Sequence, residues 1–137
     1  MKPAMIADIG GTNARFALTD LDCPEPVLSE QQSLRNSDFA SLQHAAEAYL
    51  ARVGQAPKHA AIAVASPVGS DEIRLTNRAW SFSRTELARA LHLDGLKLLN
   101  DFGAVAHAVP ALGTDDTVLL HGSSDAPLAG PVSVLGP

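Results

Sequence analysis

The stretch MIADIGGTNARFAL, residues 5–18, decides the fold of this 137-residue chain. It begins apolar, carries a carboxylate at Asp8, turns on two glycines, and becomes largely apolar again after Thr12 and Asn13. This pattern predicts a buried hairpin. A polar side chain in a buried strand costs free energy unless it has a partner. The stretch therefore raises the question of what pairs with Asp8 before the turn and with Thr12 and Asn13 after it.

The composition is that of a folded globular protein, with 46% hydrophobic residues and a mean hydropathy of +0.07. The net charge of −5, without any block of basic residues, argues against nucleic acid as a partner. The longest charge-free apolar run, residues 60–68, is far shorter than the ~20 residues of a membrane helix. A single cysteine, Cys23, cannot form an internal disulfide. We therefore expect a cytoplasmic protein that binds neither nucleic acid nor membrane.

Hydrophobic periodicity and turn residues predict strands alternating with helices in the second half of the chain. The helices are expected from a cap at Asp38 to Val53, from the capping box of Ser83 and Glu86, and over residues 102–109. The strands are expected at 4–10, 13–20, 27–33 and 59–68, at the start of 71–80, and at 96–101, 117–122 and 131–136.

The order of these elements indicates the fold class. Short turns make the first three strands antiparallel, whereas helical crossovers make the later strands parallel. We therefore expect one α/β domain, residues 1–137, with a mixed sheet of the five-stranded type and helices on both faces. This is the layout of the ribonuclease H-like and actin-like ATPase fold.

The first cluster with chemistry is the turn itself. Two glycines between strands are also common in plain hairpins. Asp8 beside them favours another interpretation, because a carboxylate at a strand end is costly unless it meets a cation. Glycines let backbone N–H groups approach a phosphate, and Thr12 adds a hydroxyl donor. The alternatives are a plain turn or a phosphate-binding hairpin with bound Mg²⁺.

Asn100 and Asp101 form a second cluster, where an apolar strand ends and a helix begins. Either residue could serve only as a helix cap. A carboxylate facing a cleft at a strand end is also what general-base activation of an alcohol needs. A third cluster, TNRAW at residues 76–80, gives a weaker signal: Asn77 could contact a polyhydroxyl ligand or form a turn.

Taken together, four motifs resemble the bacterial glucokinase family, of hexokinase-type architecture and outside the ROK branch of sugar kinases. The motifs are DIGGTNARFAL at 8–18, ASPV followed by LTNRAWSFS at 65–83, LLNDFGAVAHAVP at 98–110 and PVSVLGP at 131–137. The resemblance implies ATP-dependent phosphorylation of glucose at its 6-hydroxyl, at the entry to glycolysis. It allows a homodimer for the full-length protein.

The resemblance also implies a role for each matching residue. Asp101 would be the catalytic base that deprotonates glucose, Asn100 would hydrogen-bond the sugar, and Asn77 would lie near it. The first ATP phosphate loop, with Mg²⁺ held by Asp8 through water, would comprise Asp8, Ile9, Gly10, Gly11, Thr12 and Asn13.

The family continues beyond VLGP into a second phosphate loop. We therefore expect residues 1–137 to be the N-terminal small domain of a sugar kinase without its large C-terminal domain, inactive alone. An excised lobe, a proteolytic product and a truncated reading frame remain open. The alternative functions are a ribonuclease H-type nuclease, with Asp8 and Asp101 as metal ligands, and a non-catalytic sugar- or nucleotide-binding protein of the same fold.

Overall fold

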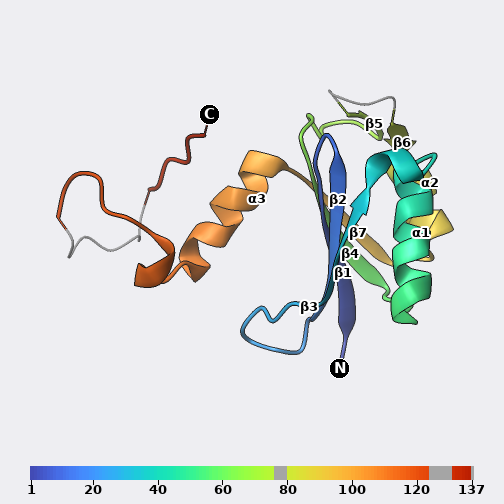
Figure 1. Cartoon of the computed structure of the whole chain (residues 1–137), viewed down its shortest axis with the longest axis horizontal. Helices are drawn as coiled ribbons and strands as arrows, with labels where there is room; N and C mark the ends of the chain where they lie inside the picture. The colour runs from blue at the N-terminus through green and yellow to red at the C-terminus, as the bar shows by residue number, and fades with distance from the viewer. Residues whose placement is uncertain (76–79, 124–130, 137) are drawn as a thin grey trace. The chain divides into compact units, whose positions relative to one another are not determined.

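The computed structural model describes residues 1–75, 80–123 and 131–136. The chain forms two compact units, Met1–Asn100 and Asp101–Pro137, and each is described by itself (Figure 1).

The first unit is built on a five-stranded mixed sheet with the order β3-β2-β1-β4-β7. The first three strands pair antiparallel, while β4 and β7 add in parallel beside β1. This arrangement confirms the mixed sheet expected from the sequence. The strands are β1 (Pro3–Ile9), β2 (Asn13–Asp20), β3 (Ser29–Arg35), β4 (His59–Val64) and β7 (Gly95–Asn100).

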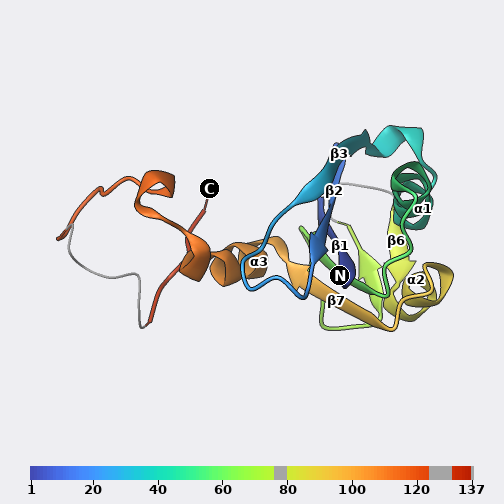
Figure 2. The same ribbon diagram turned by 90° about the horizontal axis from the view of Figure 1, so that it is seen from below.

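Helices α1 (Leu42–Val53) and α2 (Arg84–Ala90) lie on the same side of this sheet in both views (Figures 1 and 2). The short hairpin of β5 (Glu72–Arg74) and β6 (Ser81–Ser83) contributes to the same core. At its centre the rings of Phe16 and Tyr49 stack with their centroids 5.1 Å apart. The sheet, the two helices and the hairpin therefore pack around one hydrophobic core.

Helix α1 begins later than the sequence predicts. Asp38 does not cap it but closes a short 3₁₀ turn, η1 (Asn36–Asp38), and Phe39 after it is extended. The N-cap is Ser41, whose hydroxyl accepts a hydrogen bond from the His44 amide at 3.2 Å. Asp and Ser are both good N-cap residues. The extended backbone at Phe39 separates Asp38 from the helix, so Ser41 is the cap. The predicted stop at Gly54, with φ 63°, is confirmed.

The sheet face opposite α1 and α2 carries Asp8. Along β1 the residues alternate between the covered core, as at Ala7 and Ile9, and this more open face. β1 is therefore a largely buried strand, as predicted, but the side chain of Asp8 is not buried in it. Among the described residues of the first unit both α-helices cover the same face, so Asp8 alternates out to solvent.

The second unit begins with α3 (Asp101–Ala108), followed by the 3₁₀ turns η2 (Val109–Ala111) and η3 (Thr114–Asp116). The strands predicted at 117–122 and 131–136 do not form. Val118 and Leu120 are 84% and 94% exposed, and no strand pairs with this apolar run among the described residues. A strand needs such a partner for its backbone hydrogen bonds. Over the part of the chain that is described, no helix is both long and apolar enough to cross a bilayer.

Candidate functional site

The carboxyl edge of the sheet brings two of the predicted clusters together. Ile9, Val64 and Asn100 are register partners across β1, β4 and β7. The turn after β1 and the end of β7 therefore lie on the same edge. In α/β sheets this is the edge where ligands bind.

The turn after β1 is closed by a backbone hydrogen bond from the Gly10 amide to the Asn13 carbonyl, at 2.9 Å. A Cβ atom at Gly10 would lie 3.3 Å from that same carbonyl oxygen. This contact is tighter than a side chain usually makes, which favours glycine at position 10. A left-handed backbone is not the reason, since the φ of Gly10 is not positive. Ile9 is buried and can offer a ligand only its backbone.

Asp8 has a protein partner across the hairpin. Its Oδ2 lies 3.3 Å from Nη1 of Arg15, and the two side chains are 53% and 70% exposed. An ion pair this exposed contributes only about 0–1 kcal/mol. Arg15 is therefore the partner of Asp8 in this structure. The ion pair is weak, so replacing Arg15 by another cation would cost little free energy.

A polar depression borders the turn. Asn13 lines it together with the guanidinium-bearing side chains of Arg35 and Arg52, and Asp38 contributes one opposing charge. Two positive charges and one negative charge beside the turn leave this surface favourable to an anion.

Asn100 is tied into the fold by a short chain of hydrogen bonds. Its Nδ2 donates to the Ser66 carbonyl at 3.4 Å, and the Ser66 hydroxyl donates to the Arg74 carbonyl at 2.7 Å. Ser66 is only 5% exposed. The end of β7 is thereby connected to β5.

Asp101 follows Asn100 directly but is the first residue of α3 and of the second unit. Its Oδ1 accepts a hydrogen bond from the Phe102 amide at 2.9 Å. Asp101 is the first residue of α3 and not the residue before it, and its contact is with the next amide and not with the amide two or three residues on that an N-cap would hold. Of the third predicted cluster, residues 76–79, Asn77 among them, lie outside the described residues, and Trp80 is buried in the core.

No group of three or more His, Cys, Asp or Glu side chains converges among the described residues. A self-sufficient protein metal cage is therefore absent from this part of the chain. Mg²⁺ that arrives with a nucleotide needs less, since one or two carboxylates and the phosphates hold it while it keeps several waters. The exposed carboxylate of Asp8 beside the turn fits that role.

Two residues that the sequence analysis did not single out make tertiary hydrogen bonds, one at the turn after β1 and one at the start of α2. Asn36 contacts the turn from η1. Asp71 accepts hydrogen bonds from the Ser83 hydroxyl and from the amide and hydroxyl of Thr85, at the start of α2. These hydrogen bonds lower the pKa of Asp71 below its ordinary value. The sequence holds no signal for either contact, because both partners are far away in the chain.

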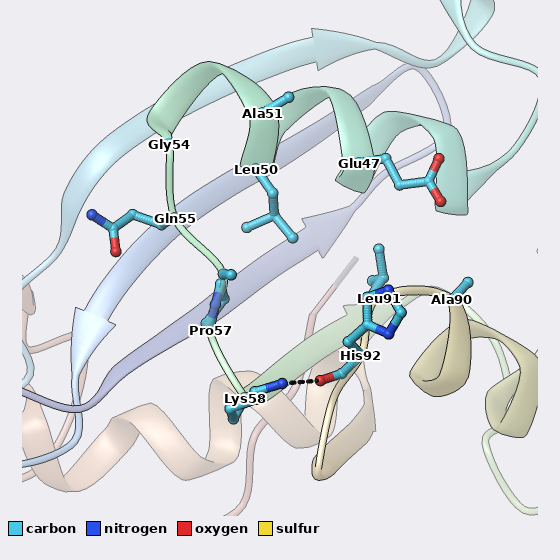
Figure 3. A pocket seen from close by; sticks show the side chains of 11 residues that line it. Glu47, Leu50, Ala51, Gly54, Gln55, Pro57, Lys58, Ala90, Leu91 and His92 are labelled. Carbon is cyan, nitrogen blue, oxygen red and sulfur yellow. Dashed lines mark hydrogen bonds between the residues drawn. The ribbon is translucent and has the colours of Figure 1, made fainter.

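A separate, mostly apolar pocket lies at the opposite edge of the sheet, between the ends of α1 and α2 (Figure 3). Leu50, Pro57 and Leu91 line it, and Lys58 closes one side by donating to the His92 carbonyl at 3.3 Å. It contains none of the predicted site residues.

Comparison with known proteins gives one consistent family. The family model described as Glucokinase matches residues 5–137. The glucokinase of Ralstonia nicotianae is 42% identical over 144 residues, which cover 98% of this chain and 41% of the relative. The glucokinase of Xanthomonas oryzae pv. oryzae is 43% identical over 141 residues, 99% of this chain and 42% of the relative.

The solved structure of a glucokinase from an Antarctic psychrotroph superposes with a TM-score of 0.79 at 39% identity, covering 91% of this chain and 40% of that one. This likeness confirms the predicted fold. The chain thus spans about two fifths of the length of the proteins it matches.

Proposed function

Because this chain belongs to the glucokinase family, we propose that the gene product containing it transfers the terminal phosphoryl group of ATP to the 6-hydroxyl of glucose. The observation that carries the proposal is the family match, which includes both the turn after β1 and the end of β7. The products would be glucose 6-phosphate and ADP, which places the enzyme at the entry to glycolysis, in the cytoplasm.

Residues 10–13 bind the ATP phosphates in this proposal. The positive surface of Arg35 and Arg52 beside Asn13 supports it, since these two guanidinium groups outweigh the one opposing charge of Asp38. Backbone N–H groups of a turn can add to such an anion site. The hydroxyl of Thr12 adds one further donor.

Asp8 is the residue that would hold Mg²⁺, through a bound water. When bound, the ion neutralises charge on the transferring phosphoryl group. The carboxylate of Asp8 would accept a hydrogen bond from a water on that ion. Exchanging the exposed Arg15 for this water costs little, because the ion pair is weak.

Asn100 and Asp101 act on the sugar. Asn100 hydrogen-bonds a glucose hydroxyl and thereby fixes the ring relative to the sheet edge. Asp101 accepts the proton of the 6-hydroxyl as that oxygen forms its bond to the phosphorus atom. Because Oδ1 accepts from the Phe102 amide, Oδ2 is the oxygen we assign to this proton. Asn77 is a further candidate for contact with the sugar.

The proposal is tested with the full-length gene product, purified and supplied with glucose and Mg·ATP, by coupling glucose 6-phosphate formation to NADP⁺ reduction. Glucose-dependent turnover that requires both ATP and Mg²⁺ supports it. Glucose or ATP binding measured by calorimetry without turnover would contradict it and favour the non-catalytic binding protein. The nuclease hypothesis has no support in the family match, and cleavage of RNA by the same preparation would revive it.

A further inference from the structure

Asn36 reaches the turn after β1 from a distant part of the chain. Its Nδ2 donates to the Gly10 carbonyl at 2.8 Å, and its backbone amide donates to the Thr12 carbonyl at 2.9 Å. Asn36 is 1% exposed and lies in η1, between β3 and α1. One buried residue therefore holds two of the carbonyls in the turn.

These contacts show which polar backbone groups of the turn are already hydrogen-bonded within the protein. The carbonyls of Gly10 and Thr12 accept from Asn36, and the carbonyl of Asn13 accepts from the Gly10 amide. A carbonyl oxygen repels a phosphate, whereas an N–H group attracts one. A turn whose carbonyls are bonded within the fold is prepared for an anion before the anion arrives.

The side chain of Asn36 is poorly suited to stability alone. Its Oδ1 is buried and has no hydrogen-bond partner among the described residues. A buried acceptor without a partner is destabilising. An apolar side chain of similar size would avoid that penalty but could not hold the Gly10 carbonyl.

We propose that Asn36 is a positioning residue for phosphate binding, which fixes the backbone of residues 10–12 in the conformation that accepts the phosphates of ATP. The inference rests on the proposed function, since it takes this turn as the phosphate loop. Asn36 is buried, so it acts through the turn and not by contact with ATP or glucose. Its effect therefore falls on the nucleotide and not on the sugar.

The test compares the wild-type full-length gene product with Asn36→Leu, which keeps the volume and loses the donor, and with the smaller Asn36→Ala. Both variants retain the backbone amide that donates to Thr12. The matched control is Ser37→Ala, because Ser37 is exposed in the same 3₁₀ turn. Hydrogen exchange of the amides of residues 10–13 is measured beside the KM values for Mg·ATP and glucose.

We expect both Asn36 variants to exchange faster at residues 10–13 while the amides of β4 stay protected. The KM for Mg·ATP should rise about three- to tenfold, as for the loss of one net hydrogen bond, with the KM for glucose unchanged. Unchanged exchange and unchanged KM for Mg·ATP would overturn the inference. Equal rises in both KM values, with faster exchange throughout the sheet, would overturn it as well. A wild-type protein without kinase activity would refute the proposed function, and the exchange data alone would then decide whether Asn36 orders the turn.

Discussion

Asn100 and Ser66 are joined at the carboxyl edge of the sheet, where the Asn100 amide donates to the Ser66 carbonyl at 3.4 Å. The contact is long and therefore weak. It ties the Asn100 side chain to the loop that follows β4. We therefore expect Asn100 to matter more to sugar binding than to folding.

Replacing Asn100 by Ala should raise the KM for glucose about tenfold, because a hydrogen bond to the sugar is lost, and should leave the KM for Mg·ATP nearly unchanged. Steady-state kinetics of the full-length gene product measure both values. Ser66→Ala is the comparison, since it removes the bond to the Arg74 carbonyl but keeps the carbonyl that receives Asn100. If Asn100→Ala leaves the KM for glucose within twofold of wild type, Asn100 only supports the loop at Ser66.

Asp101→Asn should lower kcat by at least about 100-fold, the usual effect of losing a general base, with a much smaller change in the KM for glucose. The amide of Asn keeps an oxygen that accepts from the Phe102 N–H, so the start of α3 is preserved. Asp94→Asn is the matched control, because Asp94 is an exposed acid just before β7 begins. A kcat above one tenth of the wild-type value would reduce Asp101 to a residue that orders its helix.

Asp8→Ala distinguishes a metal site from a structural ion pair. If Asp8 holds the nucleotide's Mg²⁺ through water, the Mg²⁺ concentration for half-maximal activity should rise at least about tenfold, since the carboxylate that would accept from the ion's water is lost. Melting temperature should hardly change, because the pair with Arg15 is exposed. Arg15→Ala breaks the same pair from the other side and should not change the Mg²⁺ requirement. Equal effects of the two substitutions would mean that Asp8 serves the ion pair alone.

The sequence predicted those features of the fold that depend on neighbouring residues in the chain. Apolar runs with turn residues at their ends located β1, β2, β4 and β7, and Ser83 was correctly expected to cap α2. The third strand was expected at 27–33 but lies at Ser29–Arg35, where the largely polar sequence marks its ends poorly. At α1 two eligible caps, Asp38 and Ser41, lie within one turn of each other, and the extended Phe39 between them separates the 3₁₀ turn from the helix.

Side-chain partners across long separations could not be predicted in this way. The burial of Asp8 was predicted wrongly because alternation in β1 does not say which face the helices cover. The contacts of Asn36 and Asp71 could not be predicted from the sequence. The side chain of Asn36 bonds a residue 26 positions away, and Asp71 bonds residues 12 and 14 positions away. The sequence identified the turn and the end of β7, and the tertiary hydrogen bonds show what holds each of them.

Asp71 provides a test that depends on pH. Hydrogen bonds from the Ser83 hydroxyl, then from the hydroxyl and the amide of Thr85, lower the pKa of Asp71 below its ordinary 3.8, and the nearby Arg84 acts in the same direction. A carboxyl group whose pKa is lower in the folded state binds its proton more readily when unfolded. Its contribution to stability is therefore fully present above pH 3.8 and is lost as the pH falls through the lowered pKa.

We accordingly expect Asp71→Asn to lower the melting temperature by a constant amount between about pH 5 and pH 7, because Asp71 is ionised throughout that range. The difference from wild type should shrink as the pH falls below 3.8, where the unfolded chain takes up the proton first, and toward the lowered pKa of the folded wild-type protein. The pKa of Asp20 is also lowered, by hydrogen bonds from the amides of Lys2 and Asp22, but Asp20 is unchanged in the variant and cancels in the comparison. Thermal unfolding followed by circular dichroism from pH 3 to pH 7 measures this difference. A difference that grew toward low pH would have the wrong sign and would show that Asp71 is not stabilised as the anion.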